Sequence, residues 1–200
     1  PVATEDDILK YAFALFLIHD FEKSLEVVQK GLQKNGRHAA FNRLAMYNYT
    51  DLKRYDEAEK AANDFFNASD NAEYSYLDFR YYGALLSALK KYDRAIVEYG
   101  KALEKDSSQI DVWREIADAY ELKNDYAQAI AAYQKYYDTL SQDKKTPEAL
   151  FQLGRLYYGQ GTSQDTLTVQ PADRMTAFQA ADSVFALVAR QAPDSYLGDM

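Results

Sequence analysis

The sequence predicts an all-helical protein made of stacked helical hairpins, and three observations support this prediction. The chain of 200 residues contains only 4 Pro and 8 Gly, a balance that favours long helices over many short strands. One short phrase recurs along the chain, and apolar residues at helical spacing lie on both sides of it. A chain of this length can form one domain or a short array of small units.

The recurring phrase sets the spacing of the units. It begins with an aromatic residue and ends with a small one, and its four copies lie at residues 21–24, 55–58, 92–95 and 126–129. The small residues that end successive copies are 34, 37 and 34 positions apart, which is the period of a helical-hairpin repeat. We therefore expect one hairpin for each copy.

Each unit is expected to hold two antiparallel helices. The first helix precedes the phrase and carries an apolar stripe, as at residues 79–86. The second helix begins within the phrase and carries its own stripe, as at residues 95–103, and a polar turn such as residues 90–91 joins the two. Residues 4–7 predict a capping box before the first helix, and residues 146–147 predict an N-cap followed by a proline at the first helical position.

One unit matches a known repeat at almost every signature position. The positions are Trp113, Ile116, Ala117, Tyr120, Ala129 and Tyr133, and they resemble the signature of the tetratricopeptide repeat family. A later unit has the same pattern at Leu150, Leu153, Gly154, Tyr157, Ala181, Phe185 and Pro193, while the first two units match more loosely. The resemblance implies a bacterial array folded as a right-handed α-solenoid with a concave groove. It implies one solenoid over residues 1–200, with repeats at residues 5–38, 39–75, 76–109, 110–146 and 147–193 and a partial sixth repeat at residues 194–200.

Two departures from the regular period lead to further expectations. The interval from Ala129 to Ala181 is longer than the others, and it contains a polar stretch that predicts an exposed loop inserted at residues 159–171. The chain ends soon after Pro193, so we expect the natural protein to continue. The helix that contains Phe185 and Val188 is then expected to expose apolar side chains, which predicts self-association through this face.

Composition excludes several classes of function. The net charge of −8 argues against nucleic-acid binding, which needs a basic surface for phosphates. The longest uncharged apolar stretch, residues 11–18, is too short to span a membrane and is expected to be a buried helix face. The chain has no Cys, which leaves both the cytoplasm and a bacterial cell envelope open as its location.

Nothing in the sequence predicts an enzyme. His19 and His38 are expected in turns, without the convergent partners of a catalytic or metal site. No phosphate-binding loop or dinucleotide fingerprint occurs, so we expect no cofactor.

The face that the family turns toward its groove supplies the candidate binding residues. Arg43, Arg80 and Arg114 occupy equivalent positions and are expected to form a ladder whose guanidinium groups reach solvent. Such a ladder would suit an acidic or C-terminal peptide segment, or the arginines could pair internally, with Arg43 stacked on Tyr47 and Arg114 paired with Asp118. The chaperone-binding carboxylate clamp known in the family does not match these positions. The full set of candidate groove residues is Arg43, Tyr47, Arg80, Tyr81, Arg114, Asp118, Phe151, Arg155 and Tyr158.

These observations predict a non-enzymatic scaffold that binds a protein or peptide partner in the groove. Two alternatives stay open. One is a glycan- or small-ligand-binding module that uses Tyr47, Tyr81 and Tyr158, and the other is a structural spacer for a domain outside this chain.

Overall fold

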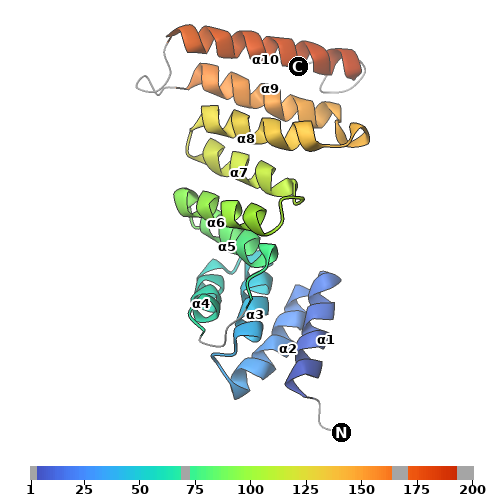
Figure 1. The fold of residues 1–200 in the computed structure, drawn as a ribbon, viewed down its shortest axis with the longest axis vertical. Coiled ribbons are helices and arrows are strands. Elements are labelled where there is room, and N and C mark those ends of the chain that lie inside the picture. The colour runs from blue at the N-terminus through green and yellow to red at the C-terminus, as the bar shows by residue number, and fades with distance from the viewer. Residues whose placement is uncertain (1–3, 69–72, 164–170, 193–200) are drawn as a thin grey trace. The chain divides into compact units, whose positions relative to one another are not determined.

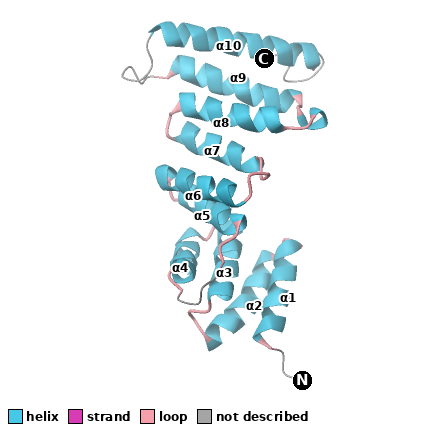
Figure 2. Ribbon diagram, viewed as in Figure 1, coloured by secondary structure: helices cyan, strands magenta, loops and turns pink. Residues whose placement is uncertain are grey.

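The computed structural model describes residues 4–68, 73–163 and 171–192, and within these ranges it contains helices and no strand (Figures 1 and 2). The prediction of an all-helical chain of hairpins is confirmed. The helices are α1 (Glu5–Leu17), α2 (Phe21–Lys34), α3 (Ala39–Asp51), α4 (Tyr55–Phe66), α5 (Tyr76–Ala88), α6 (Tyr92–Lys105), α7 (Asp111–Leu122), α8 (Tyr126–Thr139), the 3-10 turn η1 (Gln142–Lys144), α9 (Pro147–Thr162) and α10 (Pro171–Gln191).

Helices pack mainly against their neighbours along the chain. The principal pairs are α1 with α2, α3 with α4, α5 with α6, α7 with α8, and α9 with α10. The chain divides into two units, residues 1–106 with α1 to α6 and residues 107–200 with α7 to α10. In unit 1, α3 also contacts α1, α2 and α5, and in unit 2, α8 contacts α9. The single solenoid expected over residues 1–200 stays a prediction.

Small residues lie where the two helices of a pair cross. Ala58, Ala95 and Ala129 are completely buried. A Cβ atom on Gly83 of α5 would lie 2.7 Å from the ring of Tyr99 of α6, so only glycine permits this close crossing. The small residue of the recurring phrase therefore has a packing role.

The predicted helix starts are confirmed. Thr4 and Asp7 form a capping box at α1, in which the Asp7 amide donates to Thr4 Oγ1 at 3.2 Å and the Thr4 amide donates to Asp7 Oδ2 at 2.9 Å. Thr146 accepts a hydrogen bond from the amide of Ala149, and Pro147 occupies the first turn of α9.

The turns inside the first four hairpins share an unusual backbone conformation. His19, Lys53, Lys90 and Asn124 each follow a first helix, and their φ angles lie between 58° and 61°. This left-handed region favours glycine, because a Cβ atom crowds the following carbonyl oxygen. These turns therefore store strain in each hairpin.

The inserted loop begins later than predicted. Residues 159–162 belong to α9, although they were expected to be loop. Gly161 is buried, and a Cβ atom on it would lie 2.7 Å from the ring of Phe178 of α10. Gly159 and Gly161 thus let the last turn of α9 pack closely against large aromatic rings, and this packing keeps the turn helical. Residues 164–170 of the expected loop lie outside the described residues.

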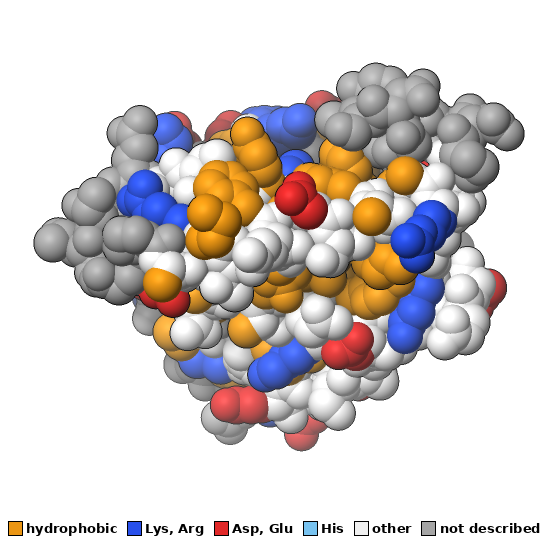
Figure 3. All heavy atoms as spheres, turned by 90° about the horizontal axis from the view of Figure 1, so that it is seen from above, with side chains coloured by type: hydrophobic (Ala, Val, Ile, Leu, Met, Phe, Trp, Pro, Cys, Tyr) orange, Lys and Arg blue, Asp and Glu red, His pale blue; other side chains and the backbone are white. Residues whose placement is uncertain are grey.

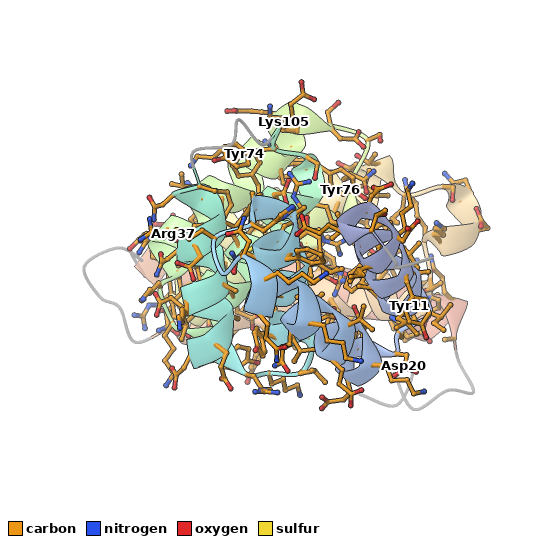
Figure 4. The ribbon with its side chains drawn as sticks, turned by 90° about the horizontal axis from the view of Figure 1, so that it is seen from below. Tyr11, Asp20, Arg37, Tyr74, Tyr76 and Lys105 are labelled. Carbon is orange, nitrogen blue, oxygen red and sulfur yellow. The ribbon has the colours of Figure 1, made fainter. Side chains whose placement is uncertain are left out.

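The stretch at residues 11–18 is not a fully buried face. Ala12, Leu15 and Phe16 are buried, but Tyr11, Leu17 and Ile18 are 58%, 60% and 70% exposed. Helix α1 packs mainly against α2 and α3, and these three side chains lie on the part of its surface that is left exposed. Figure 4 shows Tyr11 at the outer edge of α1.

The apolar side chains of α10 face α9, which corrects the expectation that they form an open end face. Ala181 and Val188 are buried. The ring centroid of Phe185 lies 5.5 Å from that of Phe151 of α9. The opposite side of α10 carries exposed Met175 and Leu187 among polar residues, and apolar, basic and acidic side chains mix on this end of unit 2 (Figure 3). Pro193 and residues 194–200 lie outside the described residues.

Candidate binding surface

Some of the predicted groove positions of unit 1 line an apolar pocket between α1 and α3. Its volume is about 220 Å³. Two of the predicted candidates, Arg43 and Tyr47, lie in its wall. The complete lining consists of Leu9, Lys10, Phe13, Ala40, Arg43, Leu44 and Tyr47.

A row of aromatic rings runs beside this pocket and links three first helices. The centroids of Phe13 and Phe16 on α1 lie 6.0 Å apart, and Phe16 lies 5.6 Å from Tyr47 on α3. Tyr47 stacks in turn on Tyr81 of α5 at 4.4 Å. Tyr81 also donates its hydroxyl to Asp51 Oδ2 at 2.8 Å. The row fixes the orientation of the Tyr47 ring.

Asp78 is the central polar residue of unit 1, and its side chain is completely buried. Tyr47 donates its hydroxyl to Asp78 Oδ1 at 2.6 Å, and Ser75 donates both its amide and its hydroxyl to Oδ2, at 2.7 and 2.9 Å. Burial, followed by the negative charge of Asp78, raises the pKa of Tyr47, so the phenol stays a neutral donor. Asp78 was missed as a candidate, although Ser75-x-x-Asp78 before an apolar run is a capping-box pattern.

Arg43 is held against the protein. Its Nε atom lies 2.9 Å from Asp78 Oδ1 as an ion pair without good hydrogen-bond alignment. Its Nη2 atom donates to the carbonyl of Glu73 at 2.6 Å, and the guanidinium lies 4.9 Å from the ring centroid of Phe65. A buried carboxylate and a backbone carbonyl thus draw Arg43 inward, although its side chain is still 30% exposed, and its ring contact is with Phe65 rather than the expected Tyr47.

Unit 2 contains a second pocket, between α7, α8 and α9, with a volume of about 270 Å³. It brings together three predicted candidates, Arg114, Asp118 and Arg155. The remaining lining residues are Glu121, Tyr133, Gln152 and Leu156. The pocket is therefore mostly polar and carries two cations and two acids.

Arg155 is oriented by its neighbours. Its two terminal nitrogens donate to the two carboxylate oxygens of Glu121 at 2.5 and 2.8 Å, and its Nε donates to Gln152 at 2.8 Å. Desolvation by the surrounding protein raises the pKa of Asp118, and the charge of Arg114 opposes that shift. Arg114 itself is exposed.

The other candidates lie elsewhere. Arg80 is half-buried on α5, in a different unit from Arg114, so the ladder of three arginines stays a prediction. Phe151 and Tyr158 point toward α10, where Tyr158 lies 5.7 Å from Phe178. Tyr47 is only 2% exposed and cannot offer a ring face to a sugar, which removes it from the glycan alternative.

The described ranges contain neither a metal-binding cluster nor a membrane-spanning helix. No group of His, Asp and Glu side chains there is arranged to hold a metal ion. No helix in the same ranges combines the length and the apolar character that crossing a bilayer requires.

The fold consists of paired helices with small residues at their crossings, and pockets lie on the first helices of the pairs. This arrangement is that of a helical-hairpin repeat protein. Residues 110–138 match the sequence model of the tetratricopeptide repeat family. This match identifies residues 110–138 as a tetratricopeptide repeat, and the solved structures below share the fold of the chain. No curated protein matches the chain significantly.

Solved structures with the same fold include several repeat proteins. The C-terminal part of a TPR repeat-containing protein from Cytophaga hutchinsonii is 24% identical with a TM-score of 0.72, covering 95% of this chain and 67% of that one. YrrB, described as a TPR protein with an unusual peptide-binding site, is 16% identical with a TM-score of 0.69, covering 96% and 88%. MamA from Desulfovibrio magneticus is 14% identical with a TM-score of 0.68, covering 98% and 100%.

Proposed function

We propose that this protein is a non-enzymatic scaffold that binds an extended segment of another protein on the exposed faces of its first helices. The observation that carries the proposal is the apolar pocket between α1 and α3, which side chains of two successive first helices form together. Helical-repeat arrays bind partners on such extended faces. The peptide-binding site described for YrrB, which shares the fold, supports the same use.

The pocket of unit 2 supplies polar contacts for the same kind of partner. Arg155 is engaged by Glu121, whereas Arg114 is exposed at the pocket and its guanidinium suits a carboxylate. An acidic residue in the bound segment would pair with Arg114. Binding should therefore weaken as salt is raised.

A display library of random twelve-residue peptides, selected on the full chain, tests the proposal. Selected peptides should bind the chain in solution, as measured by fluorescence anisotropy. The variant Phe13→Asp should bind them more weakly, because it places a charge at the rim of the apolar pocket. The variant Arg114→Glu should bind peptides that contain acidic residues more weakly. The matched control is Arg190→Glu, an exposed arginine on α10 outside both pockets. Selection of no binder, or of binders indifferent to both pocket variants, would contradict the proposal.

A further inference from the structure

We propose that the pocket between α1 and α3 takes an aromatic side chain of the partner polypeptide, with a carboxylate on the same or an adjacent residue. This inference rests on the proposed function and names the chemistry that the first pocket recognises. Four features of the pocket carry it, namely its size, its walls, its charge and the fixed position of Tyr47.

The size and walls suit one aromatic ring. A cavity of about 150 Å³ lined by Leu, Ile and Phe is known to accommodate benzene, and this pocket measures about 220 Å³. Leu9, Ala40 and Leu44 supply aliphatic surface, and the exposed ring of Phe13 supplies aromatic surface. Aromatic pairs gain from offset or edge contacts beyond the area they bury. A ring is therefore favoured over a polar side chain.

The charge of the lining favours an acid beside that ring. The lining contains two cations, Lys10 and Arg43, and no acidic residue. The Lys10 side chain is paired with Asp6, but the two are 74% and 68% exposed, so their ion pair is weak and Lys10 can exchange partners. Arg43 is fixed at the opposite helix by Asp78. An incoming carboxylate would thus pair with Lys10 on α1, because the charge of Arg43 on α3 is already engaged by Asp78.

One wall of the pocket, Tyr47, is fixed before a ligand arrives. Tyr47 is held by its hydrogen bond to Asp78 and by its stack on Tyr81. A wall that does not need to reorganise lowers the entropy lost on binding. One ring in an open pocket still gives weak affinity, so neighbouring contacts along an extended chain must supply the rest. This is why a polypeptide, rather than a free aromatic acid, is the proposed occupant.

Small probes test the chemistry directly on the full chain. N-acetylphenylalanine should bind saturably by ligand-observed NMR, more tightly than octanoate or N-acetylaspartate. Its amide should bind about two- to fivefold more weakly, which is the size of an exposed ion pair. Lys10→Ala should remove this difference between acid and amide, whereas Lys30→Ala, an exposed lysine on α2, should preserve it.

Filling the pocket supplies the second arm. Ala40→Phe adds a ring to the pocket wall and should abolish probe binding, while Ala186→Phe, the same change at an exposed position of α10, should not. Circular dichroism checks that both variants are folded. Equal binding to both variants, or octanoate binding more tightly than the aromatic acid, overturns the inference.

The two proposals fail in different ways. If library peptides bind but lack an aromatic residue next to an acid and are indifferent to Ala40→Phe, the scaffold function stands and the aromatic anchor is wrong. If the probe binds in the pocket but no peptide does, the anchor chemistry stands and the scaffold function is wrong. Peptides with the aromatic and acidic pair that lose binding only in Ala40→Phe support both.

Discussion

Replacing Tyr47 with Phe should destabilise the protein by about 1.5–3 kcal/mol, the worth of a hydrogen bond to a charged group. The change keeps the ring and its stack on Tyr81 but removes the hydroxyl that donates to Asp78 at 2.6 Å. Asp78 is completely buried, so no solvent can replace the lost donor. For a chain of 200 residues the melting temperature should fall by about 3–12 °C. Urea and thermal unfolding followed by circular dichroism at 222 nm measure the loss.

Tyr81→Phe is the matched control for this variant. It removes a hydroxyl of the same chemistry, but the acceptor is Asp51, which is exposed and can be solvated in its place. The expected cost is therefore smaller, about 0.5–1 kcal/mol. If Tyr47→Phe costs less than about 0.5 kcal/mol, or no more than Tyr81→Phe, then the Asp78 cluster does not join α3 to α5 in the way described.

Three further changes test the packing, the turns and the charges. Gly83→Ala should destabilise by about 1–3 kcal/mol because its Cβ would overlap the ring of Tyr99, whereas Gly100→Ala, with nothing within 4 Å of its Cβ, should stabilise by about 0.5–1 kcal/mol; urea unfolding of both variants compares them. Lys90→Gly should stabilise by about 0.5–1 kcal/mol in the same assay, since it relieves a left-handed residue, and a loss of stability would show that the turn is not strained. The pKa of Asp118 is raised by desolvation, so the folded state binds more protons than the unfolded state, and stability falls as pH rises through that window. Asp118→Asn should therefore be more stable than the parent at pH 7 but not below about pH 4, and thermal melts across this range check the sign.

Local spacing in the sequence was enough to predict the helices and their crossings. The aromatic-to-small phrase marks the start of each second helix from α2 to α8, and glycine or alanine occupies the close crossings. These features depend on contacts within one hairpin, so the period alone predicts them. The end of α9 was not predictable in this way. Its polar, glycine-containing sequence is typical of a loop, and only the rings of Tyr126 and Phe178 explain why residues 159–162 remain helical.

The candidate site was harder to predict, because the exposure of a groove residue depends on the following hairpin. Arg43 and Arg114 occupy equivalent positions of their first helices. Opposite Arg43, the next first helix carries the buried acid Asp78, and the guanidinium is drawn toward it. At the position equivalent to Asp78, the helix after Arg114 carries Ala149, which has no charge to offer, and Arg114 stays exposed in its pocket.

The same sequence column therefore yields an arginine paired with a buried acid in one unit and an exposed, pocket-lining arginine in the other. The residue that decides between them lies on the next hairpin, just before the leading apolar position of its first helix. An acid at that position withdraws the arginine from the binding face and, through Tyr47, stiffens the pocket beside it. A small apolar residue leaves the arginine exposed, as Arg114 is. The two pockets thus differ in chemistry: the one between α1 and α3 is apolar, whereas the one lined by Arg114 is mostly polar and holds an exposed cation.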